Sequence, residues 1–229
     1  MHTPELWVRS GIAGVLSIVC YILAIALPWP ETQLGTVIAL VVMSAWPILS
    51  IIYSFGLFSF IAIEQDSAAN RLGFVFAVAA FTMVLAMIVV QSAVGAAIED
   101  ITAGLDEQTT HALWRGLRMI DLGLDVAWDL LIGTALVFSG IAMRRRRGLG
   151  AGWAIPSAVL GICLIILNLA TFPWPPADRE LVDIGPFIGL FVMALATRLA
   201  ILGARSERDR LCSNGNAQQA DAADETQIE

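Results

Sequence analysis

The chain has no lysine, only two histidines and few charged residues of any kind. Charged residues make up 14% of its 229 residues, whereas a soluble domain carries about 25%, so the chain lacks the charge to build a water-facing surface. The histidines are His2 and His111, which excludes an intramembrane metal site built on histidine. Because every cationic side chain is an arginine, the composition also suggests a GC-rich bacterial genome.

The motifs of common enzyme and cofactor sites are missing as well. The three cysteines, Cys20, Cys163 and Cys212, form no CxxC pair and no zinc spacing with histidine. The sequence contains no HExxH, no GxSxG and no glycine-rich phosphate loop. It also has no basic patch interleaved with aromatics, so nucleic acid is not an expected partner. We therefore expect no metal and no cofactor, and the pattern favours a protein that is not an enzyme.

What the chain has instead is apolar sequence in long runs. Apolar residues make up 58% of the chain, and a run of about 20 of them crosses a bilayer core as a helix. We predict an all-α transmembrane helical bundle with six spans in one domain, residues 1–204, and a polar tail, 205–229, that is disordered because it cannot bury enough apolar surface. The six predicted spans are about 10–28, 35–63, 72–98, 120–143, 152–172 and 184–204.

The distribution of arginine predicts how the chain is threaded. Short cytoplasmic loops of membrane proteins carry an excess of arginine and lysine. With the N-terminus inside, nine of the 13 arginines are cytoplasmic, including the cluster Arg144–Arg147, and only Arg115, Arg118 and Arg179 are external. We therefore predict a multi-pass protein of the bacterial inner membrane with both termini in the cytoplasm. We also expect the arginine cluster to contact anionic lipid headgroups.

The fourth predicted span carries an unusual row of carboxylates. Asp121, Asp125 and Asp129 follow one another at intervals of four residues, which places them on one helix face, and Asp129 lies about 12 Å deeper than Asp121. Arg118 precedes the row on the same side. We call these three aspartates the acidic ladder. Charged residues inside membranes generally face the bundle interior and often mark ion or proton paths.

Two interpretations of the acidic ladder remain open from the residues alone. In the functional one, it faces a watery cleft and conducts ions or protons. In the structural one, Asp121 is interfacial and the deeper aspartates are satisfied by polar side chains of neighbouring helices. The candidate partners are Gln91 in the third span, Asn168 in the fifth and Arg198 in the sixth, although Arg198 can also extend to the cytoplasmic surface. Asp183 opens the sixth span, where a carboxylate suits a helix N-terminus.

Proline and tryptophan mark the predicted external turns. Pro28-Trp29-Pro30 follows the first span, and Pro173-Trp174-Pro175 follows the fifth. Proline ends a helix and tryptophan favours the membrane interface, so we interpret both as helix stops with an interfacial anchor; a duplicated unit relating the two ends of the chain is the alternative. A further proline, Pro47, lies inside the second span and predicts a bend.

Three stretches of the C-terminal half resemble a known group of proteins. They are Gly123–Asp129, Thr171–Asp178 and Val182–Phe187. The chain resembles, through these stretches, uncharacterised bacterial six-helix integral membrane proteins of the domain-of-unknown-function type. The resemblance implies a polytopic inner-membrane protein and assigns no role to any residue.

Two functional hypotheses from different classes follow. One is a small transporter or a proton- or ion-permeable bundle that uses the acidic ladder together with Arg118, Asn168 and Arg198. The other is a non-catalytic membrane module that binds lipid, a small hydrophobic ligand or a partner protein. An aspartyl hydrolase is a weaker fit, because intramembrane versions usually draw their two acids from different helices. The expected partners are thus membrane lipid and a small ligand or ion.

Overall fold

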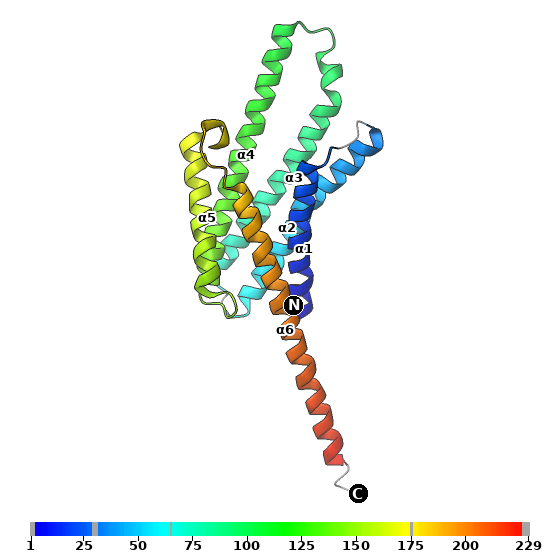
Figure 1. Cartoon of the computed structure of the whole chain (residues 1–229), viewed down its shortest axis with the longest axis vertical. Helices are drawn as coiled ribbons and strands as arrows, with labels where there is room; N and C mark the ends of the chain where they lie inside the picture. Colours follow the sequence, from blue (N-terminus) through cyan, green and yellow to red (C-terminus); the bar gives the residue numbers. More distant parts are fainter. Residues whose placement is uncertain (1–2, 29–31, 65, 175, 226–229) are drawn as a thin grey trace.

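Within the residues that the structure describes, the fold is all-α, as predicted, with six long helices. The computed structural model describes residues 3–28, 32–64, 66–174 and 176–225. In these ranges a short 3₁₀ turn, η1, accompanies the long helices (Figure 1). The elements are α1 (Pro4–Ala26), α2 (Gln33–Ala62), α3 (Ala68–Thr102), α4 (Glu107–Met143), α5 (Gly150–Thr171), η1 (Pro176–Arg179) and α6 (Gly185–Glu225).

The surface of this bundle is that of a multi-pass membrane protein. Each of the six long helices contains a window long and apolar enough to cross a membrane. Large apolar side chains face outward on every one of them; Ile25 is 67% exposed and Leu34 is 70% exposed. A water-soluble protein rarely leaves so much contiguous apolar surface uncovered. In a bilayer the same surface contacts lipid, while each helix satisfies its own backbone hydrogen bonds.

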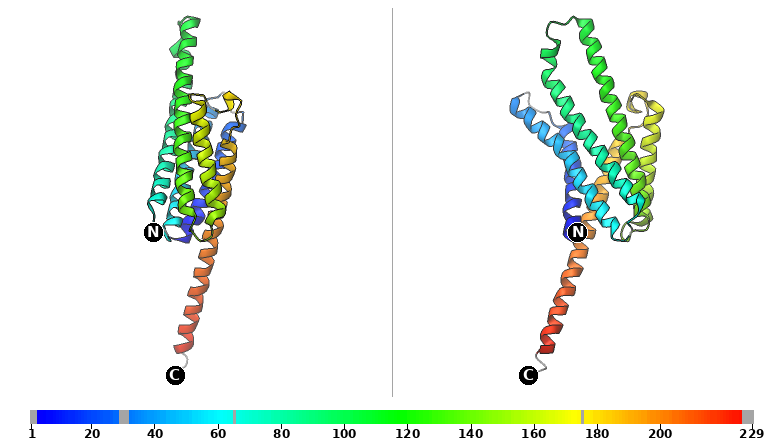
Figure 2. Two further views of the ribbon diagram at one scale, coloured as in Figure 1. Left: turned by 90° about the vertical axis from the view of Figure 1, so that its left-hand side faces the viewer. Right: turned by 180° about the vertical axis from the view of Figure 1, so that it is seen from behind.

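The helices are arranged as an incomplete ring. Helix α1 packs against α2 and α6, α2 packs against α3, and α4 packs against α3 and α5 (Figures 1 and 2). Helices α5 and α6 contact each other only slightly, so the ring is weakest at that position. The first turns of α2, before Pro47, lean away from α1 (Figure 2).

Small residues allow the packed helices to approach closely. A Cβ at Gly161 of α5 would lie 2.4 Å from the Gly133 carbonyl oxygen of α4. A Cβ at Gly11 of α1 would lie 2.6 Å from the Ala196 carbonyl oxygen of α6. Such distances leave no room for a side chain. Helix pairs in membranes commonly associate through small residues in this way, because van der Waals packing replaces the hydrophobic effect as the driving force.

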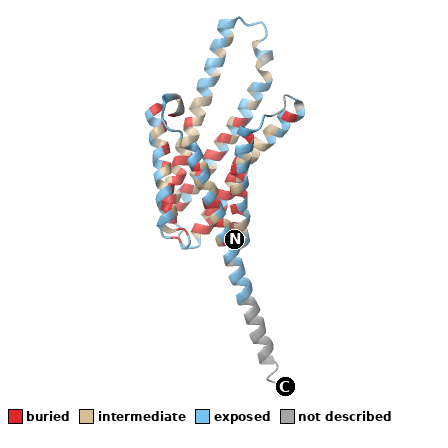
Figure 3. Cartoon of the chain, viewed as in Figure 1, coloured by how far each residue is buried: buried red, intermediate tan, exposed pale blue. Residues whose placement is uncertain are grey.

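Burial is concentrated in the half of the bundle that contains the N-terminus (Figure 3). There, Trp7 of α1 packs edge-on against Phe60 of α2, with 5.1 Å between the ring centroids. Met143 and Leu199, from α4 and α6, join the same core and are fully buried. The opposite half is more open, and that is where the acidic ladder lies.

The four arginines of the Arg144–Arg147 cluster lie at the end of the bundle that contains the N-terminus (Figure 1), and they differ in exposure. Arg144, Arg145 and Arg147 are exposed, but Arg146 is only 7% exposed. Its guanidinium donates to the carboxylate of Glu64 and lies over the ring of Phe60, 3.9 Å from the centroid. The expectation that the whole cluster contacts lipid headgroups is therefore wrong for Arg146, because this side chain is used to join two loops of the protein.

Two helices extend beyond the others at the opposite end. Helix α4 has 37 residues and α5 has 22, which correspond to about 55 Å and 33 Å at 1.5 Å per residue. The last part of α3 and the first part of α4 therefore project as a two-helix arm (Figure 1). Gly95 and Gly116 lie in this arm, and a Cβ at either would meet nothing within 4 Å, so the two helices of the arm are not tightly packed there.

Helix α6 differs from its expected length. It continues to Glu225 and projects from the bundle (Figure 1), whereas the sequence predicted that a disordered tail begins at residue 205. The segment 205–225 contains no proline and several alanine, glutamine, glutamate and arginine residues, which have good helix propensity. Disorder of this tail in solution stays a prediction.

Candidate functional site

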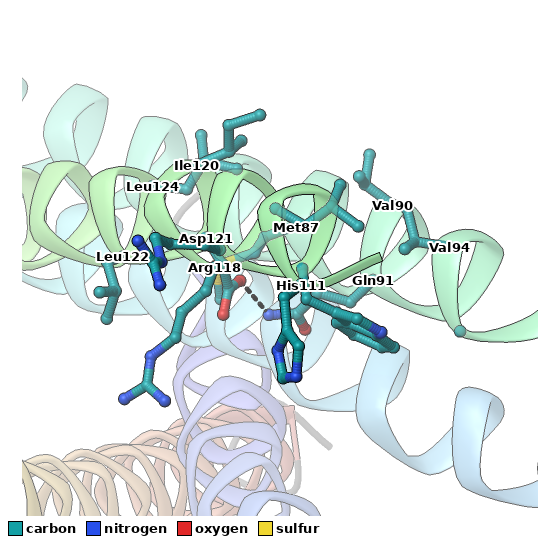
Figure 4. A pocket seen from close by; sticks show the side chains of 14 residues that line it. Met87, Val90, Gln91, Val94, His111, Arg118, Ile120, Asp121, Leu122 and Leu124 are labelled. Carbon is teal, nitrogen blue, oxygen red and sulfur yellow. Dashed lines mark hydrogen bonds between the residues drawn. The ribbon is translucent and has the colours of Figure 1, made fainter. Parts of the chain in front are cut away.

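The acidic ladder lies on α4, and its members meet different neighbours. All three aspartates are half-buried. Asp121, nearest the arm, accepts a hydrogen bond from the side-chain amide of Gln91 on α3 (Figure 4). Asp125 and Asp129 lie deeper and face other elements. The ladder thus divides into an upper member that is held by α3 and two lower members that belong to a different cluster.

Asp129 contacts α5 through the predicted partner Asn168. The Asn168 side chain is completely buried, and its amide hydrogen-bonds Asp129. The same amide nitrogen donates to the Leu164 carbonyl oxygen one turn back, at 3.0 Å. The amide oxygen, Oδ1, has no hydrogen-bond partner among the described residues. Asn168 therefore orients its amide toward Asp129 and leaves a buried acceptor unused.

A third carboxylate approaches from the start of α6. Asp183 Oδ1 accepts a hydrogen bond from the backbone amide of Gly185 at 2.8 Å, so the predicted position at a helix N-terminus is confirmed. Asp183 also lies close enough to interact electrostatically with both Asp125 and Asp129. The sequence did not predict this approach, because Asp183 is more than 50 residues from the ladder.

Three aromatic rings from three helices stand beside these carboxylates. The rings of Tyr21 on α1 and Trp46 on α2 have centroids 4.7 Å apart. Trp46 in turn meets Trp128 of α4 edge-on, at 5.9 Å. The Tyr21 hydroxyl interacts electrostatically with all three carboxylates named above. The whole group is called the acid–aromatic cluster below; it consists of Tyr21, Trp46, Asp125, Trp128, Asp129, Asn168 and Asp183.

Sequence reasoning missed the aromatic half of this cluster. Trp128 follows Asp125 by three residues, a spacing that places the two side chains near each other on α4, but the apolar pattern of the sequence assigned Trp128 to the stripe opposite the ladder. Tyr21 and Trp46 lie on helices with no polar ladder, and their register against α4 depends on packing. Trp128 Nε1 is also a buried donor without a hydrogen-bond partner among the described residues. This burial supports placing Trp128 in the acid–aromatic cluster.

Among the ion pairs found in the described residues, none joins an arginine to the two lower aspartates, Asp125 and Asp129. Arg198 lies elsewhere: its guanidinium donates twice to the Gly148 carbonyl oxygen, at 3.0 Å each, and so ties α6 to the α4–α5 loop. Arg118 lies on the arm beside Asp121. The predicted residues therefore separate into three places, and only Asn168 joins the lower aspartates.

A groove of about 870 Å³ lies between α3 and α4 in the arm. Its lining is mostly apolar, with polar groups from His111, Arg115, Arg118 and the Gln91–Asp121 pair (Figure 4). The apolar lining includes Met87, Val90, Val94, Trp114, Leu117 and Ile120. Asp125 and Asp129 are not part of this lining, so the groove and the acid–aromatic cluster are two separate features.

Within the described part of the chain, no group of three or more histidine, cysteine, aspartate or glutamate side chains has the geometry to hold a metal ion. Cys20, Cys163 and Cys212 are free thiols. Both predicted proline–tryptophan turns, Pro28-Trp29-Pro30 and Pro173-Trp174-Pro175, lie partly outside the described residues. In the second turn, Arg179 lies over the ring of Trp174, 5.7 Å from its centroid.

Comparisons of the chain with protein-family models, with curated proteins and with solved structures gave no match. The resemblance to six-helix bacterial membrane proteins stays a prediction. Any function must therefore be argued from the residues and their geometry.

Proposed function

We propose that this multi-pass membrane protein is a small transporter that moves a proton or another cation through the acid–aromatic cluster. The observation that carries the proposal is the pair of half-buried carboxylates, Asp125 and Asp129, which have no ion-pair partner among the described residues. A charged side chain near the bilayer centre costs about 2.5–3.5 kcal/mol on insertion scales. The protein tolerates that cost at two positions one helical turn apart, and no ion pair between either aspartate and an arginine occurs in the part of the chain that the structure describes.

The physical consequence is a site that attracts positive charge. Two carboxylates on one face, with Asp183 nearby, repel one another when all are ionised. A bound proton or cation relieves both the repulsion and the desolvation. Transport also requires a conformational change, and the slight contact between α5 and α6 is compatible with one, because Asn168 lies on α5 and Asp183 lies just before α6.

We further propose a bacterial inner membrane with both termini in the cytoplasm. The N-terminus and the Arg144–Arg147 loop lie at the same end of the bundle (Figure 1), and nine of the 13 arginines belong to that end by the predicted threading. Positive charge accumulates on the cytoplasmic side of membrane proteins. The arm and the acid–aromatic cluster then belong to the external half.

The test measures transport and stability on one purified variant. Asp129→Asn retains the shape of the side chain and removes its charge. If the cluster carries a cation, the variant loses flux in liposomes under an imposed proton or sodium gradient, while its unfolding free energy changes by less than about 1 kcal/mol, as for a substitution without a packing defect. Asp209→Asn, an exposed aspartate on α6 beyond the bundle, makes the same chemical change and should transport normally.

The structural hypothesis predicts the reverse result. If Asp129 and Asn168 form only a packing contact between α4 and α5, then Asp129→Asn should change the melting temperature. It should not change cation flux. Unchanged flux together with a large fall in melting temperature would retire the transporter proposal.

A second function is favoured by the groove in the arm. Its apolar lining and the two cations Arg115 and Arg118 suit a lipid or another hydrophobic ligand with an anionic headgroup. Filling the groove by Val94→Trp should then remove lipid that copurifies with the protein, as detected by native mass spectrometry, without changing cation flux. An identical lipid content in that variant would argue against this second function.

A further inference from the structure

The residue composition of the acid–aromatic cluster indicates which class of cation it binds. We propose that it binds a protonated organic amine with an apolar body. This inference rests on the proposed function, since it names the class of cargo, but binding can be measured without transport. Four features of the cluster support it.

The carboxylates supply the charge. Asp125 and Asp129 come from α4, and Asp183 comes from the start of α6, so negative charge reaches the cluster from two sides. An ammonium group between them would form charge-assisted hydrogen bonds, which are roughly twice as strong as neutral ones. The carboxylates alone do not distinguish an amine from a metal ion.

The aromatic rings favour an organic amine over a metal ion. Tyr21, Trp46 and Trp128 are in contact in series, with centroid distances of 4.7 and 5.9 Å, and they come from α1, α2 and α4. Ring faces attract organic ammonium groups and contact their apolar bodies. A small hard cation instead requires about six oxygen ligands, and aromatic rings supply none.

The buried amide of Asn168 favours a ligand that can donate a hydrogen bond. Its Oδ1 atom is fully buried without a partner among the described residues, and the same amide contacts Asp129. A buried acceptor that is left unsatisfied costs about 1–3 kcal/mol, so a ligand that donates to it gains that free energy. An amine with an N–H group meets the requirement, whereas a quaternary ammonium group has no hydrogen to donate.

The unpartnered Trp128 Nε1–H is consistent with this arrangement. As a donor it cannot ligate a metal ion. It can donate to a ladder carboxylate or to an acceptor on the ligand once the cluster is filled. The cluster as a whole combines an amide and carboxylates from α4, α5 and the segment before α6 with aromatic rings from α1, α2 and α4, a combination that suits an amphipathic amine.

The experiment compares three probes on the purified full chain in a non-ionic detergent at neutral pH. The probes are benzyldimethylamine, which is protonated there, its quaternary analogue benzyltrimethylammonium, and sodium ion; binding is measured by titration calorimetry. We expect the tertiary amine to bind about tenfold more tightly than the quaternary analogue, equivalent to one hydrogen bond, and both to bind more tightly than sodium. Equal affinity for the two organic cations, or tighter binding of sodium, would overturn the inference.

Paired variants locate the binding. Trp46→Leu removes a ring and should weaken amine binding by about tenfold, within the range of a desolvated cation–π contact, and Asp129→Asn should weaken it at least as much. Phe187→Leu, which removes an outward-facing ring from α6, and Asp209→Asn are the controls and should bind normally. Equal losses in a variant and its control would place the amine outside the cluster.

The same probes separate this inference from the proposed function. Amine binding at the cluster without amine or proton flux in liposomes would contradict transport and leave the ligand class intact. Sodium or proton flux that depends on Asp129, with no amine binding, would leave transport intact and contradict the ligand class.

Discussion

The guanidinium of Arg146 pairs with the carboxylate of Glu64 across two loops that are 82 residues apart in sequence but adjacent in space. The second oxygen of Glu64 accepts a hydrogen bond from the backbone amide of Arg147 at 3.0 Å. Phe60 lies under the guanidinium. One carboxylate thus joins the α2–α3 loop to the α4–α5 loop at the end of the bundle where burial is greatest.

Removing that pairing should destabilise the protein. Arg146→Gln leaves the Glu64 carboxylate and the Phe60 ring without their cation. Because Arg146 is buried but the Glu64 side chain is 35% exposed, the cost lies between that of a surface ion pair and that of a buried one, at about 1–3 kcal/mol. The adjacent exposed residue provides a matched control: Arg145→Gln removes the same charge and should change the unfolding free energy by less than about 0.5 kcal/mol. Chemical denaturation in detergent measures both. Equal effects at the two positions would show that only net loop charge matters.

The contact between α4 and α5 predicts a different kind of sensitivity. Gly161→Ala places a methyl group 2.4 Å from the Gly133 carbonyl oxygen, so the helices must separate, at a cost of about 1–3 kcal/mol for overpacking. Gly116→Ala in the arm meets nothing within 4 Å and should be neutral or stabilise the helix by about 0.5–1 kcal/mol. Thermal melting curves of the two variants should therefore shift in opposite directions or differ clearly. A stable Gly161→Ala variant would mean that the close approach is not required.

The proposed orientation can be tested with one pair of alanines. Ala103 and Ala68 are both exposed, and they lie at opposite ends of α3. In a background with the three native cysteines replaced by serine, Ala103→Cys should react with a membrane-impermeant thiol reagent applied to intact cells. Ala68→Cys should react only after lysis. The opposite pattern would reverse the threading and place the arginine cluster outside.

The start of α4 should be sensitive to pH. Asp106 accepts hydrogen bonds from the Thr109 backbone amide at 2.9 Å and from its hydroxyl at 2.7 Å, and these bonds lower the pKa of Asp106 below its ordinary value of 3.8. Because the folded pKa is the lower one, the cap stabilises the helix fully above pH 3.8 and loses that effect as the pH falls through the depressed value. Hydrogen-exchange protection of the Thr109 amide should fall over that window.

The start of α3 is the control for that measurement. Its cap is Ser67, whose hydroxyl accepts from the Asn70 amide at 3.2 Å and does not titrate. Protection of the Asn70 amide should stay constant over the same range. A parallel loss at both helix starts would indicate acid unfolding of the bundle rather than titration of Asp106.

The six helices were predictable because the bilayer imposes a local rule. A segment that crosses it must be apolar and must satisfy its own backbone hydrogen bonds, and both properties can be seen in a window of about 20 residues. The shared face of Asp121, Asp125 and Asp129 was predictable for the same reason, since it depends only on the 3.6-residue turn. The role of Asp183 at the start of α6 was also local.

Relations between helices were not predictable from windows of sequence. Arg146 looks identical to its three arginine neighbours in the chain, and only the position of Glu64 makes it a buried link. Arg198, a candidate partner for aspartate, bonds instead to the Gly148 carbonyl oxygen. The meeting of Asn168 with Asp129, and of Tyr21 and Trp46 with Trp128, depends on how helices rotate and slide against one another. Sequence therefore determined that the chain crosses a membrane and which face of α4 is acidic, because hydropathy and helix periodicity are local properties. Tertiary packing decided which residues that face contacts, because close packing at residues such as Gly161 sets the register between helices.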